Sequence, residues 1–223
     1  MVNKPVWESL TKELNAAGAT LVAVSKTKPA SDIQELYNLG QRHFGENYVQ
    51  ELVTKQEQLP ADICWHYMGH LQSNKVKYIA PFVHLIHAVD SYKLLVEINK
   101  QAEKNGRVID VLLQMHIADE ETKFGMEEAE IFGLLEHYTA QQDAMQHVRI
   151  CGLMGMASNT DDEAKIRSEF ARLCNFFTHL ADTTFFAKPY FAIKSIGMSS
   201  DYGLALAAGG NMVRIGSMLF GSR

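Results

Sequence analysis

The chain has few cysteines and no cluster of basic residues. Its three cysteines, Cys64, Cys151 and Cys174, are too few and too widely spaced for a disulfide framework, and no two of them form a Cys-x-x-Cys pair. The net charge is −5 and the lysines and arginines do not gather into a block, so the sequence offers no electrostatic footprint for nucleic acid or for an anionic membrane surface. We therefore expect no nucleic-acid partner and a reducing, cytoplasmic location.

Long apolar segments are also missing. The first ten residues, M-V-N-K-P-V-W-E-S-L, lack the apolar core of a secretory signal, and no apolar run approaches the length of a membrane span. The chain also lacks the proline-, glycine- or serine-rich linkers that often separate domains. We therefore expect residues 1–223 to form a single domain that makes no membrane contact.

The chain does contain a regular alternation of strand-like and helical segments. Apolar strand-like runs occur at residues 20–25, 43–46, 64–69, 85–89, 109–117, 148–154, 191–196 and 212–219. Helical periodicity lies between them, at residues 31–39, 48–58, 72–79, 92–105, 127–139, 161–181 and 201–208. An additional amphipathic helix comes first, with Trp7, Leu10, Leu14 and Ala17 on one stripe. Capping boxes at Ser31–Gln34 and Thr160–Glu163 are predicted to begin two of the helices.

This alternation predicts an α/β fold with parallel strands, because each strand is followed by a helix that crosses back over the sheet. Eight such strands can close into a single (β/α)8 barrel of the TIM type. Few residues follow the eighth strand in this sequence, so we expect the additional N-terminal helix to cover that gap in the outer ring. A doubly wound open sheet is the alternative, but its first strand typically leads into a glycine-rich turn, and here S-K-T-K-P follows.

A lysine ends the first strand. The segment V-A-V-S-K-T-K-P, residues 22–29, is an apolar run that stops at Lys26. Residues that directly follow the strands of a barrel share one mouth, where a lysine amine can form an imine with a carbonyl group. An ordinary solvated Lys-Thr-Lys turn is the commoner explanation of these eight residues alone, so the interpretation depends on the rest of the chain.

Two glycine- and serine-containing segments lie at the seventh and eighth strands. They are I-G-M-S-S-D, residues 196–201, and G-G-N-M-V-R-I-G-S, residues 209–217. Backbone N–H groups and hydroxyls bind anions at such positions, and this pair of loops is the usual phosphate site of the barrel. Either segment alone could be an ordinary turn. Together with Lys26, they predict a phosphorylated aldehyde held as a Schiff base, and pyridoxal 5′-phosphate is the obvious one.

Seven segments, in order along the chain, resemble the pyridoxal phosphate homeostasis protein family (YggS/PROSC family), which consists of single-domain relatives of the alanine racemase N-terminal barrel. They are V-A-V-S-K-T-K-P, F-G-E-N-Y-V-Q-E, W-H-Y-M-G-H-L-Q-S-N-K, T-K-F-G, G-L-M-G-M, G-M-S-S-D and V-R-I-G-S-M-L-F-G. The resemblance extends from Val22 to Gly221 and therefore covers nearly the whole chain.

The resemblance implies roles for individual residues. Lys26 would form the Schiff base, and Arg214 would meet the pyridine nitrogen. The other implied cofactor-binding residues are Ser199, Gly216 and Ser217 at the phosphate, Asn47 near the ring and Met68 in the pocket wall.

An arginine at the pyridine nitrogen bears on catalysis. A carboxylate would keep that nitrogen protonated, whereas a guanidinium stays charged and only donates a hydrogen bond, which leaves the ring a weak electron sink. Racemisation would also need acid/base groups on both faces, and in the two-domain racemases resembled here the second comes from an additional domain. We therefore expect a monomeric protein that is not an enzyme, and that buffers pyridoxal phosphate and delivers it to apo forms of enzymes that require it.

Two other functions fit the sequence. One is a single-domain, pyridoxal phosphate-dependent amino-acid racemase with a histidine or tyrosine of the mouth as base. The other is an aldolase that uses an imine on Lys26 without a cofactor. Lys123 is a candidate second amine near the mouth.

No metal site is predicted. Cys64, His66 and His70 share one face of a strand by period-two alternation, but no further ligand has suitable spacing. His84 and His87 fall on opposite faces, and we expect them to be packing or surface residues.

Overall fold

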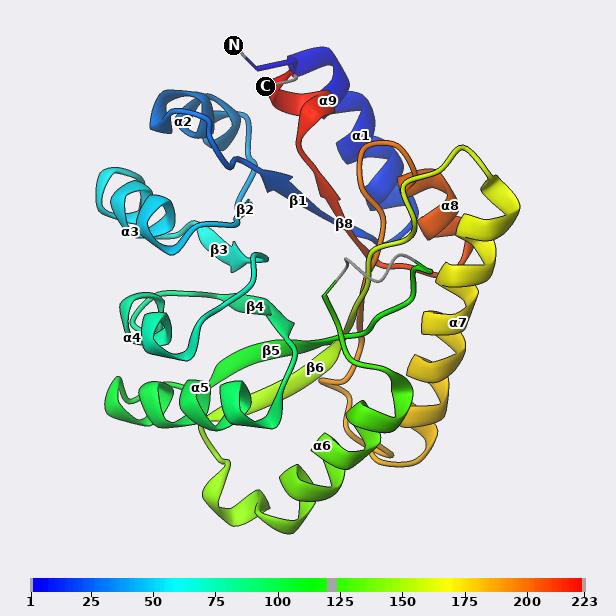
Figure 1. The fold of residues 1–223 in the computed structure, drawn as a ribbon. Coiled ribbons are helices and arrows are strands. Elements are labelled where there is room, and N and C mark those ends of the chain that lie inside the picture. The colour runs from blue at the N-terminus through cyan, green and yellow to red at the C-terminus, as the bar shows by residue number, and fades with distance from the viewer. Residues whose placement is uncertain (1, 120–123, 222–223) are drawn as a thin grey trace.

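Eight parallel strands close into a barrel, in the order in which they occur along the chain (Figure 1). The computed structural model describes residues 2–119 and 124–221, so Lys123 lies outside the described residues. The first strand pairs with both the second and the eighth, which closes the sheet. The predicted (β/α)8 barrel is confirmed, and the doubly wound open sheet is excluded.

The strands and helices alternate around the barrel. The strands are β1 (Thr20–Val24), β2 (His43–Glu46), β3 (Cys64–Tyr67), β4 (Leu85–Val89), β5 (Ile109–Gln114), β6 (Val148–Met154), β7 (Ile193–Ser195) and β8 (Met212–Ile215). The helices are α1 (Lys4–Ala16), α2 (Ala30–Asn38), α3 (Val49–Gln58), α4 (Val76–Ile79), α5 (Tyr92–Lys104), α6 (Glu128–Ala140), α7 (Glu163–Asp182), α8 (Tyr202–Ala207) and α9 (Ser217–Phe220), with short 3-10 turns at Ser73–Lys75 and Gln142–Ala144. Among the residues described, no helix has both the length and the apolar character that crossing a membrane requires.

Helix α1 lies beside β8 and α9, where the ring of outer helices would otherwise be open (Figure 1). Leu10 and Leu14 of its apolar stripe are buried. The Asn3 N–H group donates a hydrogen bond to the Leu219 carbonyl at 2.8 Å, which ties the start of the chain to the short α9. The additional helix therefore covers the gap as expected.

Several strands end earlier than their apolar runs. The predicted strand at 212–219 is the clearest case, because pairing stops at Ile215 and Ser217–Phe220 forms α9 instead. Leu219 and Phe220 are nevertheless buried. Apolar residues beyond a strand end are buried against the rim of the barrel, so hydrophobic periodicity does not show where pairing stops.

Both predicted capping boxes are wrong. Helix α7 is capped by Asp162, whose side chain accepts hydrogen bonds from the N–H groups of Ala164 and Lys165, rather than by Thr160. Helix α2 already begins at Ala30, directly after Pro29, so Ser31 lies within its first turn. At α7, the carboxylate of Asp162 is a stronger hydrogen-bond acceptor than the hydroxyl of Thr160. At α2, the φ angle of −70° at Pro29 suits a position just before a helix.

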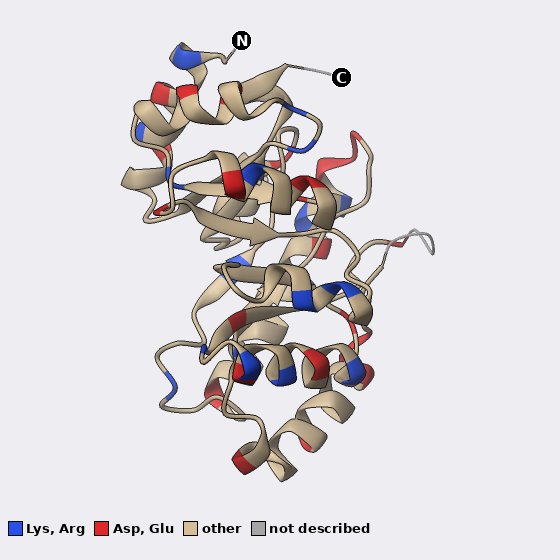
Figure 2. Ribbon diagram, turned by 90° about the vertical axis from the view of Figure 1, so that its left-hand side faces the viewer, with Lys and Arg blue, Asp and Glu red and all other residues tan. Residues whose placement is uncertain are grey.

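The apolar core has two parts. The larger part lies between strands and helices and includes Phe44, Phe170 and Leu173. The smaller part is a separate cluster that fills the barrel interior and includes Val22 and Leu112. The interior also holds buried polar side chains, which are His66, His87, Ser195 and Arg214. On the side of the molecule shown in Figure 2, basic and acidic residues are interspersed rather than separated by sign.

Candidate binding site at the barrel mouth

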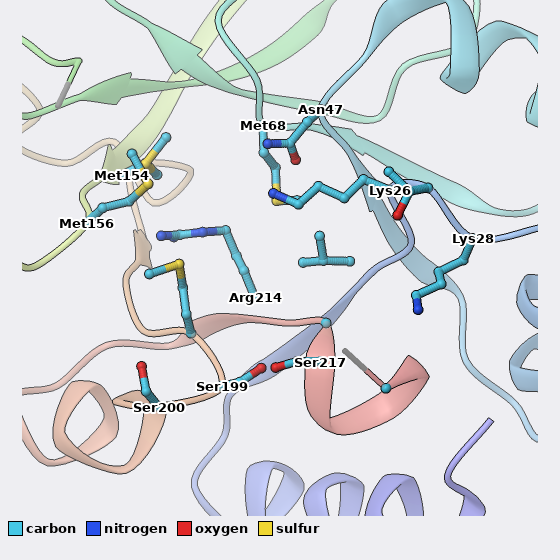
Figure 3. Close-up of a pocket in the computed structure, with 15 residues that line it drawn as sticks. Lys26, Lys28, Asn47, Met68, Met154, Met156, Ser199, Ser200, Arg214 and Ser217 are labelled. Carbon is cyan, nitrogen blue, oxygen red and sulfur yellow. The ribbon is translucent and has the colours of Figure 1, made fainter. Parts of the chain in front are cut away.

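A cavity of about 400 Å³ lies at the carboxyl ends of the strands (Figure 3). This volume is within the range of roughly 300–1,000 Å³ that is usual for small-molecule sites. The residues predicted to bind a cofactor all line this one cavity, and they are Lys26, Asn47, Met68, Ser199, Arg214, Gly216 and Ser217. The closed barrel thus brings together residues that lie up to 191 positions apart, from Lys26 to Ser217.

Lys26 extends into the cavity from a turn with an unusual backbone conformation. The next residue, Thr27, has a φ angle of 66°, which β-branched residues rarely adopt. The Glu51 carboxylate accepts a hydrogen bond from the Thr27 N–H group at 2.6 Å and so stabilises this conformation. In Figure 3 the Lys26 side chain points toward Met68 and Asn47.

A buried lysine supports this turn from below. The Lys55 ammonium donates hydrogen bonds to the Ser25 carbonyl at 2.7 Å, to Glu46 Oε1 at 2.6 Å and to Glu51 Oε1 at 2.6 Å. The Ser25 hydroxyl donates a further bond to Glu46 Oε1 at 2.6 Å. Burial raises the pKa of Glu46, while the charge of Lys55 opposes that rise. The sequence analysis missed this network, which fixes the residues on both sides of Lys26.

Asn47 and Met68 come from adjacent loops that lie very close together. A Cβ atom at Gly69 would collide with the carbonyl oxygen of Asn47, so only glycine permits this approach. The Tyr67 hydroxyl donates a hydrogen bond to the same carbonyl at 3.1 Å. The two loops are therefore held side by side at the cavity wall.

The serines lie on the opposite side of the cavity, and in Figure 3 the hydroxyls of Ser199 and Ser217 face one another. The loop that carries Ser199 begins at Gly197, whose φ angle is 91°. A Cβ atom there would lie 2.6 Å from the Cβ of Ala205, so this position also requires glycine. Two hydroxyl donors in one cavity wall form a suitable cradle for an anion.

Arg214, in β8, is buried and lines the same cavity as the serines. It donates hydrogen bonds to the Ser195 carbonyl at 2.6 Å, to the Ser195 hydroxyl at 2.8 Å and to the Gly155 carbonyl at 2.9 Å. Burial lowers the pKa of Arg214 to about 10, so the side chain stays charged at neutral pH. A guanidinium carries five N–H donors, and Arg214 lines the cavity, so it can also donate to a ligand there.

A chain of hydrogen-bonded side chains runs from Ser195 down the barrel interior. His87 Nδ1 lies 3.0 Å from Ser195 Oγ, and His87 Nε2 lies 2.8 Å from His66 Nδ1. His66 Nε2 in turn lies 2.9 Å from Nδ1 of His43. Burial holds the pKa of His66 and of His87 well below the usual range and also lowers that of His43, so these imidazoles are neutral at pH 7.

The set of possible metal ligands considered in the sequence analysis is not brought together. His70 instead lies at the mouth, with Nδ1 3.2 Å from a carboxylate oxygen of Asp90. Cys64 is also separate, because among the described residues His66 groups with His43 and His84 only. The expectation for His87 was correct in that it packs inside the barrel, but its place in a hydrogen-bonded chain was missed.

The chain matches the family profile described as alanine racemase, N-terminal domain, over residues 7–223. It is 39% identical over 224 residues to the pyridoxal phosphate homeostasis protein of Aquifex aeolicus, and the match covers 98% of this chain and 95% of that protein. This chain belongs to the pyridoxal phosphate homeostasis protein family. The family member of Escherichia coli is 38% identical over 208 residues, covering 92% of this chain and 86% of that protein. The resemblance seen in the seven segments is confirmed.

Solved structures agree with this family assignment. PipY of Synechococcus elongatus is 36% identical and has been solved without pyridoxal phosphate, with a TM-score of 0.89, and with pyridoxal phosphate bound, with a TM-score of 0.85. Both matches cover 97% of this chain and 99% of PipY. Alanine racemase of Bartonella henselae is 14% identical with a TM-score of 0.66, and the match covers 96% of this chain and 58% of the racemase, which shows a shared fold.

Proposed function

We propose that this protein binds pyridoxal 5′-phosphate covalently through Lys26 and acts in intracellular buffering and delivery of the cofactor. The observation that carries the proposal is that the Lys26 amine, the buried Arg214 guanidinium and the facing hydroxyls of Ser199 and Ser217 all lie at a single cavity. The pyridoxal phosphate-bound structure of PipY supports it, at 36% identity over nearly the whole chain. In this proposal residues 1–223 act as one domain and as a monomer.

The donors in the cavity correspond to the functional groups of the cofactor. The Lys26 amine is suited to the aldehyde carbon, and the hydroxyls of Ser199 and Ser217 are suited to the phosphate. An N–H group of the Arg214 guanidinium is suited to the ring nitrogen, which is an acceptor. The expected neighbours are Asn47 and Met68 at the ring and Gly216 at the phosphate.

When bound, pyridoxal phosphate supplies an electron sink for amino-acid chemistry. Arg214 would keep that sink weak, because its charged guanidinium has no proton acceptor and leaves the ring nitrogen unprotonated. Among the described residues that line the cavity, none is a histidine, tyrosine, aspartate or glutamate. A racemase needs a second acid/base group besides Lys26, and the ionisable side chains in the described lining besides Lys26 are Lys28 and Arg214, so the lining favours a carrier over an enzyme.

The first test is the absorption spectrum of the purified protein. A lysine imine of pyridoxal phosphate absorbs visible light, so we expect a yellow protein whose label is fixed on Lys26 by borohydride and located by peptide mapping. Lys26→Ala should abolish the label. Lys28→Ala is the matched control, because Lys28 lines the same cavity, and it should keep the label. A label found mainly on Lys28 or Lys75 would disprove the assignment.

The second test separates a carrier from an enzyme. The loaded protein is incubated with an apo-aminotransferase in the presence of a scavenger of free pyridoxal phosphate, and it is also assayed alone with amino acids. We expect reactivation of the aminotransferase and no turnover by the protein alone. Turnover of an amino acid would contradict the carrier proposal, and reactivation that the scavenger abolishes would reduce the protein to a passive reservoir.

A further inference from the structure

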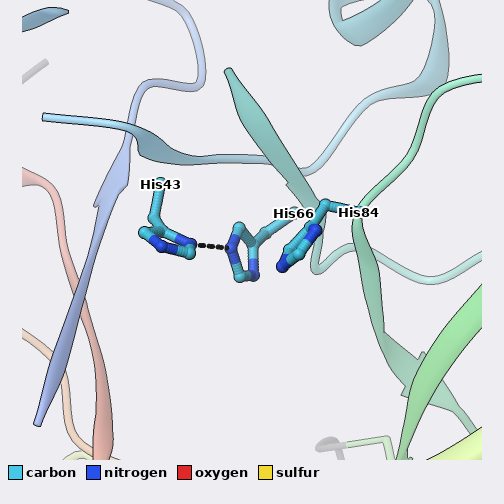
Figure 4. A group of neighbouring side chains, drawn as sticks. All are labelled: His43, His66 and His84. Atoms are coloured by element: carbon cyan, nitrogen blue, oxygen red, sulfur yellow. Dashed lines mark hydrogen bonds between the residues drawn. The ribbon is translucent and has the colours of Figure 1, made fainter. Parts of the chain in front are cut away.

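Three histidines come together near the amino-terminal ends of β2 and β4, whereas the cavity lies at the carboxyl ends of the strands, and Figure 4 shows the three rings side by side. His43 is the first residue of β2, His66 lies in β3, and His84 directly precedes β4. Each ring contacts the other two, with centroid distances of 5.2 Å for His43–His66, 5.5 Å for His66–His84 and 5.7 Å for His43–His84. One nitrogen of each ring lies within 4.8 Å of a nitrogen of both other rings. In the part of the chain that the structure describes, no other group of histidine, cysteine or acidic side chains meets this condition.

We propose that His43, His66 and His84 form a binding site for a divalent transition-metal ion such as Zn²⁺, with solvent as the fourth ligand. A tetrahedral zinc ion with Zn–N bonds of about 2.0–2.1 Å holds its ligand nitrogens roughly 3.3 Å apart. The separation of 2.9 Å between His43 Nδ1 and His66 Nε2 is slightly shorter than this spacing. The ligand nitrogen of His84 lies within 4.8 Å of those of the other two rings, so rotation of the rings would bring all three nitrogens to this spacing.

The ligand chemistry narrows the choice of ion. Three neutral imidazoles with no carboxylate among them suit zinc, copper, nickel or cobalt, whereas calcium and magnesium require oxygen ligands.

His66 is already oriented as a ligand. Its Nδ1 lies 2.8 Å from His87 Nε2, and His87 Nδ1 lies 3.0 Å from Ser195 Oγ. Histidines that bind metals almost always donate their other ring N–H group in this way, because the hydrogen bond fixes both the tautomer and the ring orientation. His66 and His87 are fully buried, so this arrangement is held by the barrel interior and points His66 Nε2 toward His43.

The remaining two histidines provide access from solvent. His84 is exposed and His43 is partly buried, so an ion can enter from the end of the barrel without crossing the core. An open side next to three histidine ligands leaves a coordination position for water. The hydrogen bond between His43 and His66 needs no third histidine. A metal site would account for the position of His84 beside both rings.

The test uses the untagged, full-length protein after treatment with a chelator. Calorimetric titration with Zn²⁺ should show one ion bound per chain, and Co²⁺ should give the visible absorption of a tetrahedral complex. His43→Gln and His84→Gln should each weaken Zn²⁺ binding at least tenfold, which is the lower range even for residues that only support a ligand. Both positions have solvent access, so these variants should fold, and circular dichroism checks that they do.

Two matched variants control for other metal ligands. His137→Gln removes an exposed histidine of α6, and Cys64→Ser removes a thiol that neighbours His43 across the β2–β3 pair. Both should bind Zn²⁺ as the unmodified protein does. Failure of the unmodified protein to bind Zn²⁺, or binding that survives either His43→Gln or His84→Gln, would overturn the proposal. The visible spectrum of the pyridoxal phosphate-loaded protein is a separate readout, so failure here leaves the proposed function untouched.

Discussion

Replacing Lys55 with methionine should destabilise the protein strongly. The side chain of Lys55 is only 7% exposed and is paired with Glu46, whose side chain is 0% exposed, at 2.6 Å. Methionine fills a similar volume but leaves the Glu46 carboxylate buried with one remaining hydrogen bond, from Ser25. Removing one partner of a buried ion pair costs about 3–5 kcal/mol, and we expect a loss of this size in the free energy of unfolding. Glu51 is partly solvated, so its lost bond adds less.

The loss should depend on pH. Burial already raises the pKa of Glu46 above its ordinary value of 4.5, and without Lys55 that pKa rises further. Between the unfolded and the folded pKa, the folded state binds more protons than the unfolded state, so stability falls as pH rises through this window. The difference between Lys55→Met and the unmodified protein should therefore be larger at pH 8 than at pH 5. Urea denaturation at both pH values measures it.

Two further variants make this prediction refutable. In the double variant Lys55→Met with Glu46→Gln no fully buried charge is left unpaired, so most of the lost stability should return. Lys100→Met, on the exposed surface of α5, is the control and should change stability by less than about 0.5 kcal/mol. A loss at Lys55 below about 1 kcal/mol, or one that is equal at both pH values, would refute the reasoning. The affinity for pyridoxal phosphate should fall together with stability, because the same network holds the Lys26 turn.

Three other predictions concern the cavity. Ser199→Ala and Ser217→Ala should each weaken binding of pyridoxal phosphate by about 1–3 kcal/mol and hardly change the binding of pyridoxal. Titrations with both ligands measure this difference, and equal losses for the two ligands would indicate an effect on folding. Arg214→Glu should retain the cofactor with an altered absorption spectrum and Arg214→Ala should mainly weaken binding, so an unchanged spectrum and affinity in both would exclude Arg214 as partner of the ring nitrogen. Gly197→Ala should lower stability by at least about 1–3 kcal/mol, measured by denaturation, because φ is 91° there.

Lys26 and the serine- and glycine-containing segments could be placed at the cavity from their positions at strands, whereas the roles of Asn47, Met68 and Arg214 were implied by the family resemblance. Lys26 directly follows an apolar strand, and the glycines and serines follow two others, so parallel topology alone places them at one mouth. The supporting residues carry no such mark. In the sequence, Lys55 is an ordinary lysine in a polar stretch of a predicted helix. Only the packing of α3 against β1 and β2 buries it beside Glu46.

By itself the sequence determined the order of the strands and the helical covering, since these follow from hydrophobic period and chain connectivity. The resemblance of its segments to a family implied the remaining cavity residues. Only the tertiary structure decided where each strand stops and which interior side chains meet. His43, His66, His87 and Ser195 become one hydrogen-bonded chain because barrel closure sets the register between their strands. Contacts of this kind depend on the stagger of neighbouring strands, which no local pattern of residues records.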